Sequence, residues 1–312
     1  MSTGLIENIS GTGAKRYAQK RAANGRPVRM RTAQSADPSG RRAGAITYAL
    51  LAIVVLVSVF PLYYAAILGS STRVEIAQSP LPRLVPGANL IENIGRIVTN
   101  HQIDFWMSFM NSLVVAVVVS AATVFFSTLA GFAFAKLTFR ARTGLYVFVI
   151  ATMIIPMQLG TVPMFIMMSD FGWLDTLTAL IVPSLVAAFG VFWMTQYLSE
   201  ALPYELIEAA RVDGASVFRV FWSIAMPVAK PAAATLALFT FVGSWNNFFW
   251  PSVVLRSQNT LPLVIPQLSG AFTSDHAIIM SGVFLIALPL LVAFVFLGRM
   301  LVSGVMAGAV KG

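Results

Sequence analysis

The segment 202–227 holds the residues best suited to contact another macromolecule. It reads LPYELIEAARVDGASVFRVFWSIAMP. Pro203 and Glu205 favour the first turn of a helix, because proline is tolerated there and a carboxylate complements the positive helix end. Gly214 permits the left-handed conformation that ends a helix, and Ser216 suits the N-cap of a second helix. We therefore predict two short helices joined by a tight turn.

The second of these helices, 217–224, is too apolar for a surface in water, so it must bury one face. The tip of the turn, 214–216, consists of small residues that permit close approach of another backbone. A rigid helix pair of this kind can transmit a displacement to the segments that it joins. Two interpretations follow: a mechanical coupling element that docks on another protein, or an amphipathic loop that lies on a membrane surface.

The rest of the chain offers little for catalysis. None of its five lysines directly follows a glycine, so a P-loop for phosphate is not predicted. The chain contains no cysteine, which excludes thiolate metal sites and cysteine nucleophiles. His101 and His276 each stand alone, as surface histidines usually do. We therefore expect a protein that is not an enzyme and has no catalytic, cofactor-binding or metal site of its own.

Composition points to a membrane protein. Of the 312 residues, 57% are hydrophobic and 11% charged, whereas soluble domains carry about 25% charged residues. A helix needs roughly 20 apolar residues to cross the hydrocarbon core. Six stretches satisfy this, and the third and fourth are expected to form a hairpin. All six lack ionisable residues. Because ion-coupled transporters usually place such residues within the membrane, the sequence does not favour ion-coupled transport. The six stretches lie near 44–68, 107–133, 144–168, 176–198, 232–254 and 277–298.

The basic residues predict the orientation of these spans. Nine of them lie in 1–43, and only four of the 21 fall in the segments that alternate with it across the membrane. Because cytoplasmic flanks hold the excess of lysine and arginine, both termini are expected in the cytoplasm, with loops 69–106 and 255–276 outside. The net charge of +9 thus reflects membrane orientation and not nucleic-acid binding. We expect the tail 1–43 to be disordered, either touching anionic lipid heads or simply solvated.

The loop 200–231 closely resembles the "EAA" loop of ABC importer permeases. The variant is similar to that of the carbohydrate branch, the MalG-like half of maltose-type importers, and the resemblance extends over nearly all of 44–312. It implies the all-α, six-helix type I importer permease fold (MetI-like) with cytoplasmic coupling helices. The residues that carry it in the loop are Glu208, Ala209, Ala210, Asp213, Gly214, Ala215, Ser216, Phe221, Ile224, Pro227 and Pro231.

The same resemblance implies a function and a set of partners. Such a subunit lies in the inner membrane and translocates a sugar or oligosaccharide inward. It works with a second, MalF-like permease, an extracytoplasmic solute-binding protein, and an ABC ATPase dimer that binds ATP and Mg and docks on residues 208–216 and Phe221. The C-terminal residues Gly308, Lys311 and Gly312 are expected to contact the ATPase, unless this end is a frayed terminus.

Polar residues within the predicted spans are candidates for the substrate path or its gate. Amide groups beside aromatic faces suit a sugar, and Asn246 is expected past the membrane midplane, about 20 Å from the inner end of its span. The alternative is hydrogen bonding between helices, with Phe249 and Trp250 in an aromatic belt. In the family the main sugar contacts belong to the partner permease. The candidates are Asn111, Gln158, Trp245, Asn246 and Asn247.

Other functions remain open at this stage. The coupling loop is shared by importers of many solutes, so a non-sugar substrate is the nearest alternative. An ATP-independent facilitator or channel would leave the protruding apolar helix without a partner. A scaffold without substrate would leave the polar residues of several spans without a purpose. No residue of the chain distinguishes one sugar from another.

Overall fold

The computed structural model describes residues 44–78, 83–272 and 275–309. The predicted disordered tail 1–43 lies outside the described residues, as do Lys311 and Gly312. The chain divides into two compact units between Ser58 and Val59. This boundary falls within the helix Ala45–Gly69, and the contacts, loops and cavities described below belong to the second unit. Every regular element of the described residues is a helix.

Five helices within the described residues are long and apolar enough to cross a membrane. A sixth span arises if α6 (Arg142–Thr152) is counted together with the two helices that follow it, η2 (Met157–Gly160) and α7 (Thr161–Asp170). The all-helical membrane architecture therefore agrees with the sequence prediction. The five are α2 (Ala45–Gly69), α5 (Phe105–Lys136), Thr178–Ala201, Val217–Trp245 and the part His276–Val295 of α15 (His276–Ala309).

Two of these spans are composite. Residues Thr178–Ala201 comprise α8 (Thr178–Ile181), η3 (Val182–Ser184) and α9 (Ala188–Ala201), and Val217–Trp245 comprises α11 (Val217–Val220), the π-helical turn η4 (Phe221–Ala225) and α12 (Met226–Trp245). Shorter helices lie between the spans. They are α3 (Arg73–Gln78), α4 (Leu90–Val98), α10 (Tyr204–Val212), α13 (Phe249–Val254) and α14 (Leu261–Ala271).

The third predicted span, 144–168, is not one straight helix. The chain breaks between α6 and η2, and the two parts meet at an angle of 91°. Pro156 stands at the break with an extended backbone, φ −59° and ψ 127°. Proline donates no hydrogen bond and disfavours helical geometry in the residue before it, so the helix ends there.

The fifth predicted span, 232–254, is displaced in the structure. Its helix begins at Val217 and ends at Trp245, and α13 follows after a short break. The side chain of Asn247 accepts a hydrogen bond from the backbone N–H of Trp250 at 3.4 Å. Asparagine side chains compete with helical hydrogen bonds in this way, which explains why the apolar run does not continue as one helix.

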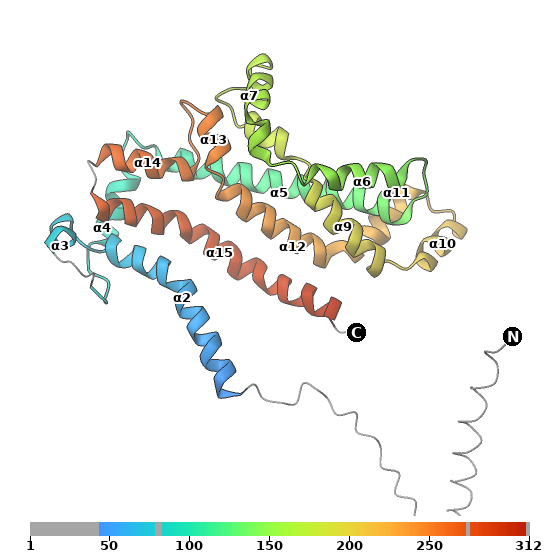
Figure 1. The fold of residues 1–312 in the computed structure, drawn as a ribbon, viewed down its shortest axis with the longest axis horizontal. Helices are drawn as coiled ribbons and strands as arrows, with labels where there is room; N and C mark the ends of the chain where they lie inside the picture. The colour runs from blue at the N-terminus through green and yellow to red at the C-terminus, as the bar shows by residue number, and fades with distance from the viewer. Residues whose placement is uncertain (1–43, 79–82, 273–274, 310–312) are drawn as a thin grey trace, which may run out of the picture. The chain divides into compact units, whose positions relative to one another are not determined.

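Helices α5, α9 and α12 run alongside one another, and α15 lies against α12 (Figure 1). The crossing of α5 and α9 is close because Gly131 faces the backbone of α9. A Cβ atom at Gly131 would lie 2.8 Å from the carbonyl carbon of Met194 and 2.9 Å from the amide nitrogen of Thr195. Small residues at such crossings allow two membrane helices to pack by their backbones.

Asp175 joins two connections that are about 80 residues apart in sequence. Its carboxylate accepts hydrogen bonds from the backbone N–H groups of Arg256 (2.8 Å), Ser257 (2.9 Å) and Gln258 (3.1 Å), and from the Ser257 hydroxyl. In return, the Gln258 amide donates to the Asp175 carbonyl at 3.0 Å. The Ser257 hydroxyl, together with the backbone donors, holds the pKa of Asp175 well below its usual range. The connection after α7 is therefore fixed to the connection after α13.

We predict that Gly131→Ala weakens the bundle. Alanine is a better helix former than glycine, so any loss must come from the crowded crossing with α9. Overpacking of this kind costs about 1–3 kcal/mol, and the thermal unfolding midpoint of the purified protein should fall. Gly144→Ala in α6 is the matched control, because a Cβ there meets nothing within 4 Å. An unchanged midpoint in Gly131→Ala would contradict the close crossing.

We predict that Asp175→Asn releases the connection 255–260, seen as faster amide hydrogen exchange at Arg256–Gln258. The folded pKa of Asp175 lies below its unfolded value of about 3.9, so the stabilisation is present above that value and lost as pH falls through the folded pKa. Between pH 5 and 8, titration of Asp175 should therefore not change the protection of the Arg256–Gln258 amides from hydrogen exchange in the wild-type protein. Asp170→Asn, an exposed neighbour, is the control. Equal exchange in both variants would refute the assignment.

Candidate functional site

The loop 200–231 has the helix–glycine–helix geometry that the sequence predicts. Helix α10 ends at Val212, and Gly214 adopts φ +78°. The N–H of Ala215 donates to the carbonyl of Ala210 at 2.9 Å, which closes the helix end. The Ser216 hydroxyl then accepts from the N–H of Arg219 at 3.3 Å and caps the next helix.

The second helix of the loop does not end before the fifth span. α11 continues through η4 directly into α12, a run of 29 residues from Val217 to Trp245. Pro227 and Pro231, two of the residues that carry the resemblance, both lie inside α12. One helical run therefore connects the loop tip at Ser216 with the far end of the fifth span.

The loop buries one face and exposes the other. Ile207, Val220 and Phe221 belong to a buried cluster with residues of α5, α9 and α12. The Phe221 ring lies 5.8 Å from that of Phe132, so Phe221 positions the loop and is not at its surface. This packing fits a protruding element anchored on the bundle better than a loop lying on a bilayer.

The other predicted coupling residues lie on the exposed side, with Ala210 and Ala215 half-buried. Two apolar side chains accompany them, because Val212 is 87% exposed and Phe218 is 69% exposed. The second helix does bury one face, at Val220 and Phe221, whereas Val217, Phe218 and Trp222 of the same helix are exposed. Exposed apolar side chains among charges are typical of a protein interface. The exposed coupling residues are Glu208, Ala209, Asp213, Gly214 and Ser216.

At the C-terminus only one of the predicted ATPase-contacting residues falls among the described residues. Gly308 lies in the last turn of α15. Lys311 and Gly312 lie outside the described part of the chain.

Three of the five candidate path residues line a common cavity of about 540 Å³. Gln158 lies in η2, and Asn246 and Asn247 occupy the break after α12. Aromatic residues of the same region complete the wall: Phe248, Phe249 and Trp250. Amides and aromatic faces thus occur together at one place, where helices are interrupted, but the aromatic residues there do not include the predicted Trp245.

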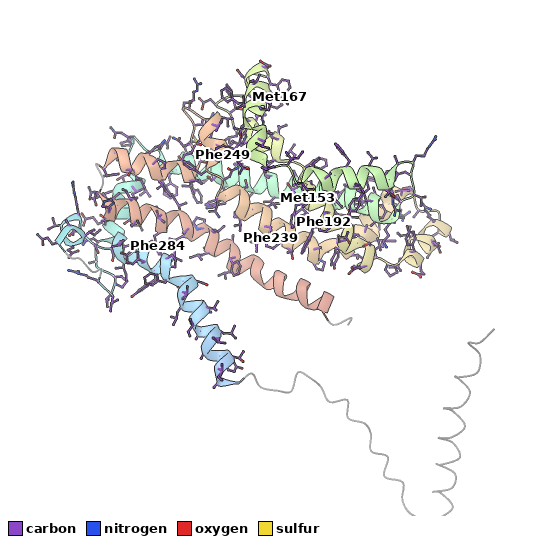
Figure 2. All side chains as sticks on the ribbon, viewed as in Figure 1. Met153, Met167, Phe192, Phe239, Phe249 and Phe284 are labelled. Carbon is purple, nitrogen blue, oxygen red and sulfur yellow. The ribbon has the colours of Figure 1, made fainter. Side chains whose placement is uncertain are left out.

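A second cavity of about 550 Å³ adjoins the first and shares Asn247, Ser184 and Gly243 with it. It reaches the side of α5 at Val115 and Val119. Figure 2 labels one residue of each cavity, Met153 after α6 and Phe249 at the start of α13. Hydroxyl groups that sequence reasoning missed also line the second cavity, and they carried no signal because serine and threonine are common in membrane helices. They belong to Ser112, Thr123, Thr152, Ser184, Thr240, Ser244 and Thr260.

Asn111 and Trp245 lie elsewhere: Asn111 ties α5 to the connection before α14, and Trp245 ties α12 to α15. The Asn111 amide donates to the carbonyl of Asn259 at 2.9 Å. Trp245 is 1% exposed, and its indole N–H donates to the carbonyl of Ile286 at 3.3 Å. Its ring also contacts Phe109, with centroids 5.9 Å apart. These two residues do not line either cavity.

A family model described as "Binding-protein-dependent transport system inner membrane component" matches residues 124–306. The chain is 31% identical to the arabinooligosaccharides transport system permease protein AraQ of Halalkalibacterium halodurans, over 84% of this chain and 94% of that protein. It is 32% identical to the lactose transport system permease protein LacG of Rhizobium radiobacter, over 85% and 96% of the two chains. The sn-glycerol-3-phosphate transport system permease protein UgpE of Yersinia pestis is 30% identical, over 82% and 93%.

A solved structure supports the same fold. It is the crystal structure of a bacterial ABC transporter involved in the import of the acidic polysaccharide alginate, with a TM-score of 0.69 and 23% identity over 81% of this chain and 94% of that one. The arrangement of apolar helices described above confirms the predicted all-α permease fold. The chain therefore belongs to the inner membrane components of binding-protein-dependent transport systems, the membrane-spanning permease subunits of ABC importers.

Proposed function

We propose that this subunit carries a neutral sugar or oligosaccharide across the inner membrane, driven by an ATPase that docks on loop 200–231. One observation carries the proposal. A single helical run leads from the exposed loop at Ser216 to Trp245, and the cavity-lining Asn246 and Asn247 follow at once. Movement of the loop is thereby linked to the shape of the cavity.

The walls of the cavities support a neutral substrate. Among the described residues, none that lines either cavity is charged. Phosphate recognition in proteins relies largely on arginine and lysine side chains, and neither cavity has one among the described residues, so an anion such as the solute named for UgpE is a less suitable occupant. The names of AraQ and LacG, which specify neutral oligosaccharides, agree with this choice.

The proposed assembly contains four kinds of subunit. A second, MalF-like permease completes the path, an ABC ATPase dimer binds ATP and Mg, and an extracytoplasmic solute-binding protein delivers the sugar. Both termini and the loop 200–231 face the cytoplasm in this arrangement, as the distribution of basic residues indicates. The end of α15, with Gly308, Lys311 and Gly312, contacts the ATPase. The chain itself needs no nucleotide site.

We predict that Gly214→Leu abolishes uptake while the chain still inserts into the membrane. The left-handed backbone at φ +78° is strained for leucine, and its side chain would project from the docking tip. Uptake of labelled lactose and arabino-oligosaccharides, and the amount of ATPase that co-purifies, measure the effect. Gly172→Leu is the matched control, because Gly172 has φ +68° and equally open space but lies in the connection after α7. Normal uptake in Gly214→Leu, or a wild-type complex without ATPase, would count against the proposal.

We predict that Asn246→Leu lowers uptake on the order of tenfold, the effect of about one lost hydrogen bond, and leaves the complex assembled. Asn111→Leu should instead reduce the yield of folded complex, because it breaks the bond to Asn259. Uptake is measured with labelled neutral oligosaccharides and with labelled sn-glycerol-3-phosphate. Transport of the anion alone would overturn the choice of a neutral substrate, and an unchanged uptake in Asn246→Leu would remove that residue from the path.

A further inference from the structure

Lys136, the last residue of α5, is a buried charge. Its side chain is only 6% exposed, and it is the one buried Lys, Arg, Asp or Glu among the residues whose burial is described. Burial of an ammonium group costs free energy unless the group finds compensating partners. Such a residue at the end of a helix therefore calls for an explanation beyond packing.

The partners of Lys136 come from two other helices. Its ammonium nitrogen donates to the carbonyl of Ser199 in the last turn of α9 at 3.0 Å. The same nitrogen lies 4.9 Å from the centroid of the Tyr204 ring, at the start of α10. The Tyr204 hydroxyl in turn donates to the carbonyl of Lys136 at 3.2 Å. Lys136 and Tyr204 thus hold each other through both side chain and backbone.

These contacts join three helix ends. The last four carbonyls of an α-helix have no partner within the helix, and a cation near them is favourable. Lys136 satisfies one such carbonyl in α9 and simultaneously contacts the first residue of α10. The end of α5, the end of α9 and the start of α10 are therefore connected at one side chain.

We propose that Lys136 is a positioning residue that transmits movement of α10 to α5, so that both walls of the cavity respond to ATP. This inference rests on the proposed docking of an ATPase on loop 200–231. The wall at Asn247 follows the continuous helix from Ser216, whereas the wall at Val119 belongs to α5 and has no such covalent route. Lys136 with Tyr204 supplies a polar route from α10 to α5, separate from the ring contact between Phe221 and Phe132.

The test uses the full complex with its binding protein, either untreated or trapped with ATP and vanadate. The chain contains no cysteine, so Val119→Cys and Asn247→Cys each place a single thiol in this subunit, one on each wall. The rate of reaction with a small methanethiosulfonate reagent is measured with and without trapping. In the otherwise native chain we expect trapping to change the rate at both positions.

Lys136→Met replaces the charge by an apolar side chain of similar volume. Such replacements of buried charged groups often leave the stability of the protein unchanged. We expect it to abolish the ATP-dependent change at Val119→Cys, to a ratio near one, and to keep the change at Asn247→Cys. Lys136→Arg should restore at least part of the response. Arg140→Met, at an exposed basic residue of the connection after α5 and outside loop 200–231, is the matched control and should behave as wild type.

Three outcomes would overturn the inference. They are a normal response at both walls in Lys136→Met, loss of response at both walls while the ATPase stays bound, and an unstable complex whose surviving fraction responds normally. If Lys136→Met does not assemble, Tyr204→Leu decides, because it removes the ring and leaves the bond to Ser199; an unchanged response at Val119→Cys then rejects the route. Absence of any ATP-dependent change in the otherwise native chain would instead reject the docking itself.

Discussion

The structure depends on one constraint, namely that backbone N–H and C=O groups find no water in a hydrocarbon core. Irregular backbone at membrane depth is tolerated only where it is buried in protein or lines a wet cavity. The breaks around Met153–Pro156, at Ser184–Ala187 and at Asn246–Phe248 obey this rule, because all three contribute to the two adjoining cavities. The same interruptions that shorten the helices thus form the walls of both cavities.

The parts of the fold that depend on local chemistry could be predicted from the sequence. Apolar runs identified the spans, and the turn at Gly214 with its cap at Ser216 follows from the conformational preferences of those two residues. The end of the fifth span at Trp245 could not be predicted in the same way. The run from Asn246 to Val254 stays largely apolar, so hydropathy alone did not reveal that the helix stops there.

The roles of single polar residues were harder to assign, since they depend on distant parts of the chain. Asn111 and Asn246 are the same residue type within predicted spans. One is held by a carbonyl 148 residues away, and the other lies open to the cavity. Lys136 ends a predicted span like many membrane-flanking lysines, and only the positions of α9 and α10 show that it is buried. Such distinctions require the tertiary arrangement, whereas the helix–glycine–helix turn of loop 200–231 could be predicted from the local sequence.

The π-helical turn Phe221–Ala225 has a consequence for how the fifth span is built. A π turn holds an additional residue compared with an α turn, and one residue corresponds to a rotation of about 100° around the helix axis. The π turn takes up its additional residue by widening one turn, so the side chains near Trp245 are not rotated by that amount relative to the loop tip. The fifth span can therefore hold one more residue between these two regions without changing the direction in which each of them faces.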